Sequence, residues 1–164
     1  MPTHKSVSLE HLGGMRFHAI PSSGHELDFD DRESDQGGSP VETILAALAS
    51  CSAMDVISIA TKKRQSVSSY RLEVSGSQRD AYPKVFTDID LVHVIEGANL
   101  AEAAIRRAIE LSATKYCPVN AMISAGATVV HHRYRIRSSG AASYEAEGEV
   151  LATGPFQRPD VVGS

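Results

Sequence analysis

Residues 37–54 read GGSPVETILAALASCSAM, and this stretch decides how the chain folds. Ser39 has the position of a helix N-cap, Pro40 suits the first helical residue, and Glu42 falls in the first turn, where the helix dipole favours a carboxylate. Between residues 41 and 60 the polar residues are few and mostly small: Glu42, Thr43, Ser50, Ser52, Asp55 and Ser58. A helix that is apolar on nearly every side is buried on most of its faces. The pattern therefore predicts a central core helix over residues 40–63.

Alternation of apolar and polar residues predicts strands on both sides of this helix. The strands are expected over residues 5–10, 15–20, 25–30, 67–78, 84–95 and 127–136. An amphipathic helix is predicted over residues 97–116, and a short helix from Cys117 to about Gly126. Because the strands are segregated from the helices rather than strictly alternating with them, the chain is predicted to be an α+β protein.

The overall composition limits the class of protein. The chain has 164 residues, which suits one domain with a core of its own. Its formal net charge is -4, so nucleic-acid binding gains no electrostatic support. No apolar run approaches the roughly 18–20 uncharged residues of a membrane span, and the N-terminus has no apolar core like that of a signal peptide. We therefore expect a cytoplasmic protein that binds neither nucleic acid nor membrane.

The central helix also sets an expectation about assembly. A single chain of this size offers limited material to cover a long helix that is apolar on most sides. We therefore expect a homodimer that buries the central helices of two copies. Within each copy, residues 1–137 are expected to form the domain, and residues 138–164 a C-terminal extension that is either a tail or an added edge strand.

Two cysteines are the chemistry that the chain offers. Cys117 precedes Pro118, which opens a helix, and the unpaired N–H groups of a helix N-terminus stabilise a thiolate. Lys115 is close enough in sequence to add to this effect. Cys51 lies in the middle of the core helix, where a structural cysteine is the more common case. A cysteine pair in the cytoplasm is more often redox-active or catalytic than a static disulfide, but position alone leaves a structural role open for both residues.

Two motifs resemble those of a known family. GGSPVETILAALASC, followed by KKRQ, has a glycine, a proline, a carboxylate, an apolar run and a cysteine in order, and KYCPV at residues 115–119 is similar to a second signature. With the β-rich N-terminal part and the paired strands between the motifs, the chain resembles the OsmC/Ohr family of organic hydroperoxide reductases, in particular its OsmC-like branch. The resemblance covers about residues 5–137.

The resemblance implies a fold and an activity. The fold has antiparallel sheets wrapped around two long central helices, in an intertwined homodimer with active sites at the subunit interface. The activity is that of a thiol peroxidase without metal or cofactor, which reduces organic hydroperoxides in the oxidative stress response. Carried over to this sequence, Cys51 is the peroxidatic residue that becomes a sulfenic acid, and Cys117 resolves it to a disulfide. A dithiol reductant, lipoyl-linked or thioredoxin-like, resets the pair.

The family also activates its peroxidatic cysteine with an arginine and a glutamate. The glutamate directly follows the proline that opens the helix; here that position is Val41, and Glu42 comes one residue later. Because Glu42 and Cys51 are nine residues apart, they lie about 180° apart around a helix. Glu42 is therefore a candidate both for activation and for capping. For the arginine, Arg32 in the loop before the helix is favoured over Arg16 on a predicted strand, with a solvated loop charge as the alternative for Arg32.

Other functions stay open. A non-catalytic OsmC-like protein that binds a hydrophobic small molecule at the dimer interface is the main alternative; the missing glutamate favours it, and the retained cysteines favour the peroxidase. An acyl-thiol hydrolase using Cys51 lacks a convincing histidine base. No metal site is predicted, because His131 and His132 are adjacent on a strand and face opposite sides, and two cysteines with a histidine match no zinc spacing.

Overall fold

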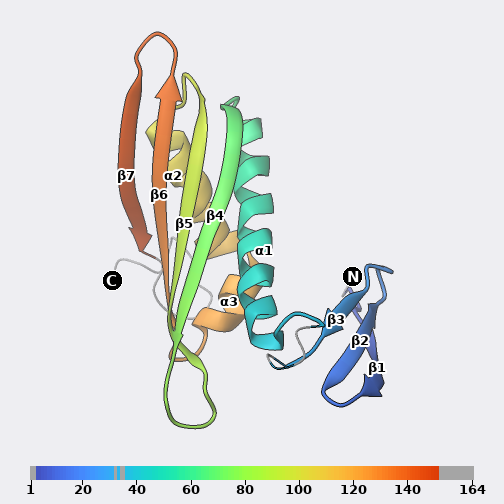
Figure 1. Ribbon diagram of the computed structural model, residues 1–164. Coiled ribbons are helices and arrows are strands. Elements are labelled where there is room, and N and C mark those ends of the chain that lie inside the picture. Colours follow the sequence, from blue (N-terminus) through green and yellow to red (C-terminus); the bar gives the residue numbers. More distant parts are fainter. Residues whose placement is uncertain (1–2, 32, 34–35, 152–164) are drawn as a thin grey trace. The chain divides into compact units, whose positions relative to one another are not determined.

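The computed structural model describes residues 3–31, 33 and 36–151, which form two compact units (Figure 1). The first unit ends at Ile44 and the second begins at Leu45. Each unit has a sheet of its own, with three strands in the first and four in the second.

The first unit is an antiparallel sheet in the strand order β1-β2-β3. Its strands are β1 (Val7–Gly13), β2 (Arg16–Pro21) and β3 (Leu27–Phe29). Gly13 ends β1 and Gly14 opens the turn to β2, with φ angles of 103° and 58°, a region that residues with a side chain rarely adopt. The three short strands predicted before the helix are confirmed, with boundaries shifted by a few residues.

The second unit contains a mixed sheet in the strand order β4-β5-β6-β7. Its strands are β4 (Ser66–Gln78), β5 (Phe86–Ala98), β6 (Val129–Ser139) and β7 (Tyr144–Leu151). β4 and β5 form the predicted hairpin, and β7 is an edge strand antiparallel to β6. β5 and β6 run parallel, so the expectation of purely antiparallel sheets is wrong. The segment from residue 99 to residue 128 is long enough to cross one face of the sheet and return in the same direction.

The helices of the second unit lie on one face of its sheet (Figure 1). They are α1 (Pro40–Lys62), which begins in the first unit, α2 (Glu102–Leu111) and α3 (Pro118–Ser124), with a π-helical turn η1 (Ser112–Tyr116) between α2 and α3. The predicted core helix and short helix are confirmed. The predicted amphipathic helix ends earlier than expected as an α-helix, because its last turn widens into η1.

α1 is less buried within one chain than its composition predicts. Only 22% of its most apolar 18-residue window is buried. By length and composition alone α1 could also cross a membrane, so the expectation that no apolar run approaches such a length is wrong. Its interruptions are mainly serines, which lower the hydropathy little. A core helix of a soluble protein passes the same test, and α1 makes polar contacts with η1 through Ser52 and Asp55.

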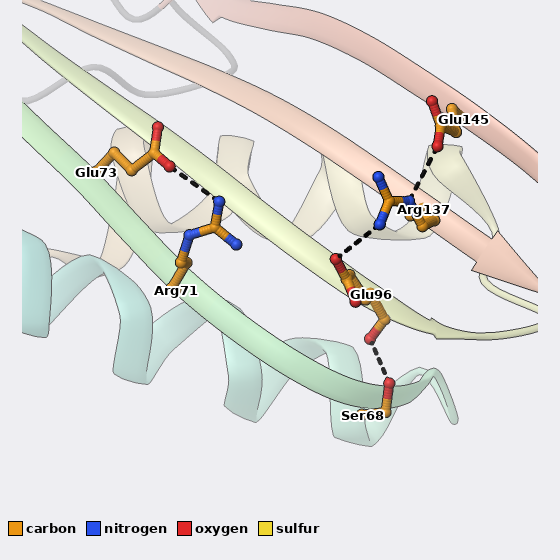
Figure 2. A network of polar contacts seen from close by, with 6 residues as sticks. All are labelled: Ser68, Arg71, Glu73, Glu96, Arg137 and Glu145. Atoms are coloured by element: carbon orange, nitrogen blue, oxygen red, sulfur yellow. Dashed lines mark hydrogen bonds and ion pairs between the residues drawn. The ribbon is translucent and has the colours of Figure 1, made fainter.

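Charged side chains cover the face of the sheet opposite the helices. Figure 2 shows Arg71 paired with Glu73 on β4, and Arg137 of β6 paired with Glu96 of β5 and Glu145 of β7. A shallow hollow on this face is lined by three arginines, and each of them has a carboxylate partner. Exposed pairs of this kind contribute little to stability. The helix-covered face is therefore the place to look for a functional site.

Candidate dithiol site

Two apolar clusters fill the space between the helices and the sheet of the second unit. The α2 cluster consists of Val56, Ala60, Ile95, Leu100, Ile105, Ala108, Ile109, Tyr134, Ile136 and Val150. The thiol cluster consists of Leu48, Ile89, Leu91, Cys117 and Val130, with Cys51 packed against it. Both cysteines therefore belong to the same cluster, although one comes from α1 and the other precedes α3.

A layer of polar side chains separates the two clusters. Three elements pass from one cluster to the other through a polar residue with no exposed surface: Ser52 on α1, His93 on β5 and His132 on β6. The set that we call the polar layer is Ser52, Asp55, His93, Ser112, Asn120 and His132. Burying polar groups is unfavourable unless they are paired. A polar layer in so small a core therefore indicates a function rather than a gain in stability.

The structure brings the two predicted thiols together. Sγ of Cys51, Sγ of Cys117 and a carboxylate oxygen of Asp55 all lie within 4.8 Å of one another. Both cysteines are free, and Cys117 is the N-cap residue of α3. A disulfide needs the two sulfurs at about 2 Å, so the side chains have a short distance to close. The proximity of the thiols is observed, whereas their roles stay predictions.

The two thiols differ in exposure and in protonation. Cys51 is half-buried, whereas Cys117 is 3% exposed. Burial raises the pKa of Cys117 well above its ordinary value, and the Cys51 thiol adds to the rise. The N–H of Asn120 does donate to Sγ of Cys117 at 3.3 Å, but this helix-terminal effect is smaller than that of burial. The predicted stabilisation of a Cys117 thiolate is therefore wrong; Lys115 is exposed and lies over the ring of Tyr116 instead.

Asp55 lies one helical turn after Cys51, on the same face of α1. Its Oδ2 accepts a hydrogen bond from the hydroxyl of Ser112 at 3.1 Å, and the hydroxyl oxygens of Ser52 and Ser112 lie 3.3 Å apart. Partial burial raises the pKa of Asp55, and the hydrogen bond from Ser112 opposes the rise. The site therefore places a carboxyl group that binds a proton more readily than in water beside two sulfur atoms.

Asn120 links Cys117 to the polar layer. Its Nδ2 donates to the carbonyl of Ala113 at 2.8 Å, which fixes the orientation of the amide. Oδ1 of Asn120 then lies 3.0 Å from Nε2 of His132. Because an amide oxygen only accepts hydrogen bonds, His132 carries its proton on Nε2. Cys117, the N-cap residue of α3, is therefore connected through Asn120 to His132 on β6 of the sheet.

A second buried histidine stacks on the first. The ring centroids of His93 and His132 are 5.9 Å apart, and Nδ1 of His93 lies 2.8 Å from the hydroxyl of Tyr70. Burial lowers the pKa of His93 to about 3 and that of His132 to about 4; His132 lowers the pKa of His93 further, and His131 that of His132. Both rings are therefore neutral at pH 7. Nε2 of His93 and Nδ1 of His132 have no hydrogen-bond partner among the described residues.

The donor atoms at the thiol pair also suit a thiophilic metal ion. Two thiolate sulfurs and one carboxylate oxygen are donors that Zn²⁺ accepts, although they are three where a structural zinc site uses four. The sequence predicts no metal site, and that stays a prediction.

The predicted activating residues are not found at the thiols in the described part of the second unit. Arg16 lies on β2 of the first unit, with Nε 3.9 Å from Oδ2 of Asp30. Glu42 is exposed in the first turn of α1, and Arg32 lies outside the described residues. Over residues 45–151 no arginine makes an ion pair or hydrogen bond with Cys51 or Cys117. The roles of these arginines and of Glu42 stay predictions.

Most residues of the polar layer are not predicted as site residues from the sequence. His131 and His132 do face opposite ways, as predicted: His131 contacts Glu149 at 2.7 Å, and His132 is buried. The role of His132 in fixing Asn120 was not recognised. A signal was present, because His93 and His132 stand at inward strand positions whose neighbours along the same face are apolar. A polar side chain at such a position is uncommon enough to be singled out.

Known proteins share this arrangement of elements. Residues 33–132 match the family model for OsmC-like protein. Protein YhfA of Escherichia coli (strain K12) is 37% identical over 118 residues, which cover 72% of this chain and 88% of YhfA. The crystal structure of an OsmC-like protein from Mycoplasma pneumoniae has a TM-score of 0.73 at 16% identity, covering 83% of this chain and 99% of that one.

A more distant structure adds a relative with a named role. The organic hydroperoxide resistance protein OsmC from Legionella pneumophila has a TM-score of 0.57 at 22% identity, covering 84% of this chain and 98% of that one. At this identity the likeness shows the fold alone. The segment that matches the family model includes both Cys51 and Cys117. From the family match and the identity to YhfA, the chain belongs to the OsmC-like protein family.

Proposed function

We propose that this chain is a cysteine-based peroxidase that reduces organic hydroperoxides and so protects against oxidative stress. One observation carries the proposal: two free thiols lie within 4.8 Å of each other, one reachable and the other buried. The Legionella relative is named an organic hydroperoxide resistance protein. That name supports the substrate class by likeness of fold.

The difference between the thiols assigns their roles. Cys51, which is half-buried, attacks the peroxide and becomes a sulfenic acid. Cys117 is shielded from solvent and stays protonated, which suits a resolving thiol that reacts only with its neighbour. It attacks the sulfur of Cys51, forms the disulfide and releases water. The disulfide then protects Cys51 from further oxidation.

The surroundings of Cys51 favour peroxides that carry an organic group. Leu45, Val119 and Ile123, like Cys51, are partly buried and pack against the thiol cluster. Binding energy from apolar contact is available to an alkyl or acyl hydroperoxide and not to hydrogen peroxide. A dithiol reductant, lipoyl-linked or thioredoxin-like, regenerates the thiols by exchange. The cytoplasm, where free thiols persist, is the compartment that this cycle requires.

A homodimer is part of the proposal. Large apolar side chains stand exposed beside the site on the single chain, with Met54 on α1 71% exposed and Met122 on α3 67% exposed. A second copy that covers α1 accounts for its apolar composition and its low burial. Light scattering is expected to give twice the chain mass of 17.6 kDa. A monomer at micromolar concentration contradicts the assembly and leaves the thiol chemistry to the test below.

The central test is stopped-flow mixing of the reduced protein with an alkyl hydroperoxide and, separately, with hydrogen peroxide. Thiol counting and intact mass follow the products. We expect loss of both thiols, a mass lower by two hydrogen atoms, and faster reaction with the alkyl hydroperoxide. If both thiols react no faster than free cysteine, the peroxidase proposal is wrong. The alternative is then a non-catalytic protein that binds a hydrophobic small molecule at the same site.

Replacing the resolving thiol is expected to stop the cycle after one step. The Cys117→Ser variant should still react with one equivalent of peroxide, because Cys51 and Asp55 are unchanged. It should then accumulate an oxygen adduct on Cys51, as sulfenic acid and further oxidised forms, since no neighbouring thiol is present to condense with it. Intact mass spectrometry detects the adduct. If the Cys117→Ser variant reduces peroxide at the wild-type rate in the presence of a dithiol reductant, the role of Cys117 is contradicted.

A further inference from the structure

We propose that Asp55 is the proton-transfer group of the dithiol site, serving first the attack of Cys51 on the peroxide and then the closure of the Cys51–Cys117 disulfide. This inference rests on the proposed peroxidase function and adds a catalytic residue to it. Asp55 lies one helical turn after Cys51 on the same face of α1. It is not the glutamate that the family resemblance places directly after the proline that opens the helix.

The position of Asp55 meets the geometric requirement. One carboxylate oxygen lies within 4.8 Å of both sulfurs, and Oδ2 is tied to the hydroxyl of Ser112 at 3.1 Å. An oxygen atom of a bound peroxide that sits about 3 Å from a sulfur and about 3 Å from a carboxyl fits a gap of this size. The hydrogen bond from Ser112 to Oδ2 restricts the orientation of the carboxyl group beside the two sulfurs.

The surroundings leave Asp55 as the group that can exchange protons. Cys117 faces it from the start of α3, Tyr70 from β4, and Cys51 from its own helix. Burial and the nearby Asp55 charge raise the pKa of Tyr70, so its phenol does not release a proton. His132, which is linked to Cys117 through Asn120, is held by its contact with the amide oxygen of Asn120. Partial burial raises the pKa of Asp55 toward the range in which a carboxyl both gives and takes a proton.

The first step balances through this carboxylate. Asp55 takes the proton of the Cys51 thiol, and the thiolate attacks the terminal, hydrogen-bearing oxygen of the hydroperoxide. A sulfur–oxygen bond forms while the oxygen–oxygen bond breaks, so sulfur is oxidised and the peroxide is reduced. The leaving alkoxide is a strong base and takes the proton from Asp55. The products are the Cys51 sulfenic acid, an alcohol and an ionised Asp55.

The second step uses the same group again. Burial keeps Cys117 protonated, so it needs a base before it can attack. Asp55 takes this proton, and the sulfur of Cys117 forms a bond with the sulfur of Cys51. The sulfur–oxygen bond breaks, and the leaving hydroxide takes the proton from Asp55 to become water. The carboxylate returns to its initial state with each turnover.

The test compares leaving groups, because proton donation matters only for a poor one. At pH 7 the Asp55→Asn variant is expected to react with tert-butyl hydroperoxide about 100-fold more slowly than wild type. With peracetic acid, which releases a weakly basic acetate, only the acceptor of the Cys51 proton is missing, so the loss is expected to be at least about 5-fold smaller than with tert-butyl hydroperoxide. The Asp55→Glu variant should recover part of the rate with tert-butyl hydroperoxide. Stopped-flow loss of the Cys51 thiol gives each of these rates.

Asp90→Asn is the matched control. It removes a half-buried aspartate that pairs with Arg133, and it should leave both rates unchanged. Equal losses with both oxidants in Asp55→Asn, without recovery in Asp55→Glu, overturn the proposal, because such a pattern indicates a structural role. Unchanged rates overturn it as well. Failure of the peroxidase function itself is seen separately, as a wild-type protein that reacts with neither oxidant faster than free cysteine does.

Discussion

The Cys51→Ser variant is expected to reduce alkyl hydroperoxides at least about 10³-fold more slowly than the wild-type protein. The thiol that remains, Cys117, is 3% exposed, so a peroxide cannot approach it directly. Burial also raises the pKa of Cys117, and each unit of that rise lowers the thiolate fraction tenfold. Both effects act on the nucleophile itself, which is why the expected loss is larger than for any other single substitution in the site.

Peroxide consumption in a coupled assay with a dithiol reductant measures this loss. Ser50→Ala is a suitable control, because Ser50 is exposed next to Cys51 and its hydroxyl only donates to the carbonyl of Ala47. It should keep nearly the wild-type rate. A Cys51→Ser protein that retains more than about a tenth of the activity would mean that Cys117 is the peroxidatic residue, with the two roles exchanged.

Acid is expected to unfold the second unit by charging its two buried histidines. The pKa of His93 is lowered to about 3 and that of His132 to about 4 in the folded protein, against about 6.5 in the unfolded chain. Below pH 6.5 the unfolded chain therefore binds more protons, and the free energy of unfolding falls as the pH falls. Above pH 6.5 the full contribution is present. From pH 6.5 to pH 4 the pair is expected to cost on the order of 5 kcal/mol.

A loss of this size is a large part of the stability of an ordinary domain. Urea unfolding followed by circular dichroism at pH 7, 5.5 and 4.5 measures it. A variant that carries both His93→Gln and His132→Gln should show a clearly flatter pH dependence, because glutamine does not titrate. His25→Gln, at an exposed position, should leave the dependence as it is in wild type. The prediction is wrong if the double variant and wild type lose stability in parallel.

The fold could be predicted from the sequence wherever the pattern is local. The apolar run of α1 and the alternation in β4 and β5 each stand within one element, and they were recognised. The parallel pairing of β5 with β6 was not, because nothing within either strand states the direction of its neighbour. That direction follows from the connection between them, which crosses the sheet through α2 and α3. The low burial of α1 within one chain is in line with the limited cover that a single copy is expected to offer, and the second copy stays a prediction.

In the site, too, the contacts between residues of different elements could not be predicted from local sequence patterns. The two cysteines were selected as chemistry, but their pairing came from the resemblance to a family and not from their spacing. The polar layer depends on contacts such as Ser52 with Ser112 and Asn120 with His132, which join residues of different elements. In the sequence, Asp55 stands only as one of the few polar residues of the core helix. Its proximity to Cys117 required the fold, because α1 and α3 meet only in three dimensions.

The proximity of Cys51 and Cys117 depends on one extra residue in the π-helical turn η1. A turn of this kind amounts to one extra residue inserted into an α-helix. Its removal would restore a regular α-helix and rotate everything downstream by about 100° around the axis, which swings Cys117 away from Cys51. A relative that has lost this residue keeps both cysteines in an alignment and loses their contact. Among such relatives, the spacing between α2 and the second cysteine is a better guide to shared chemistry than the presence of the cysteines.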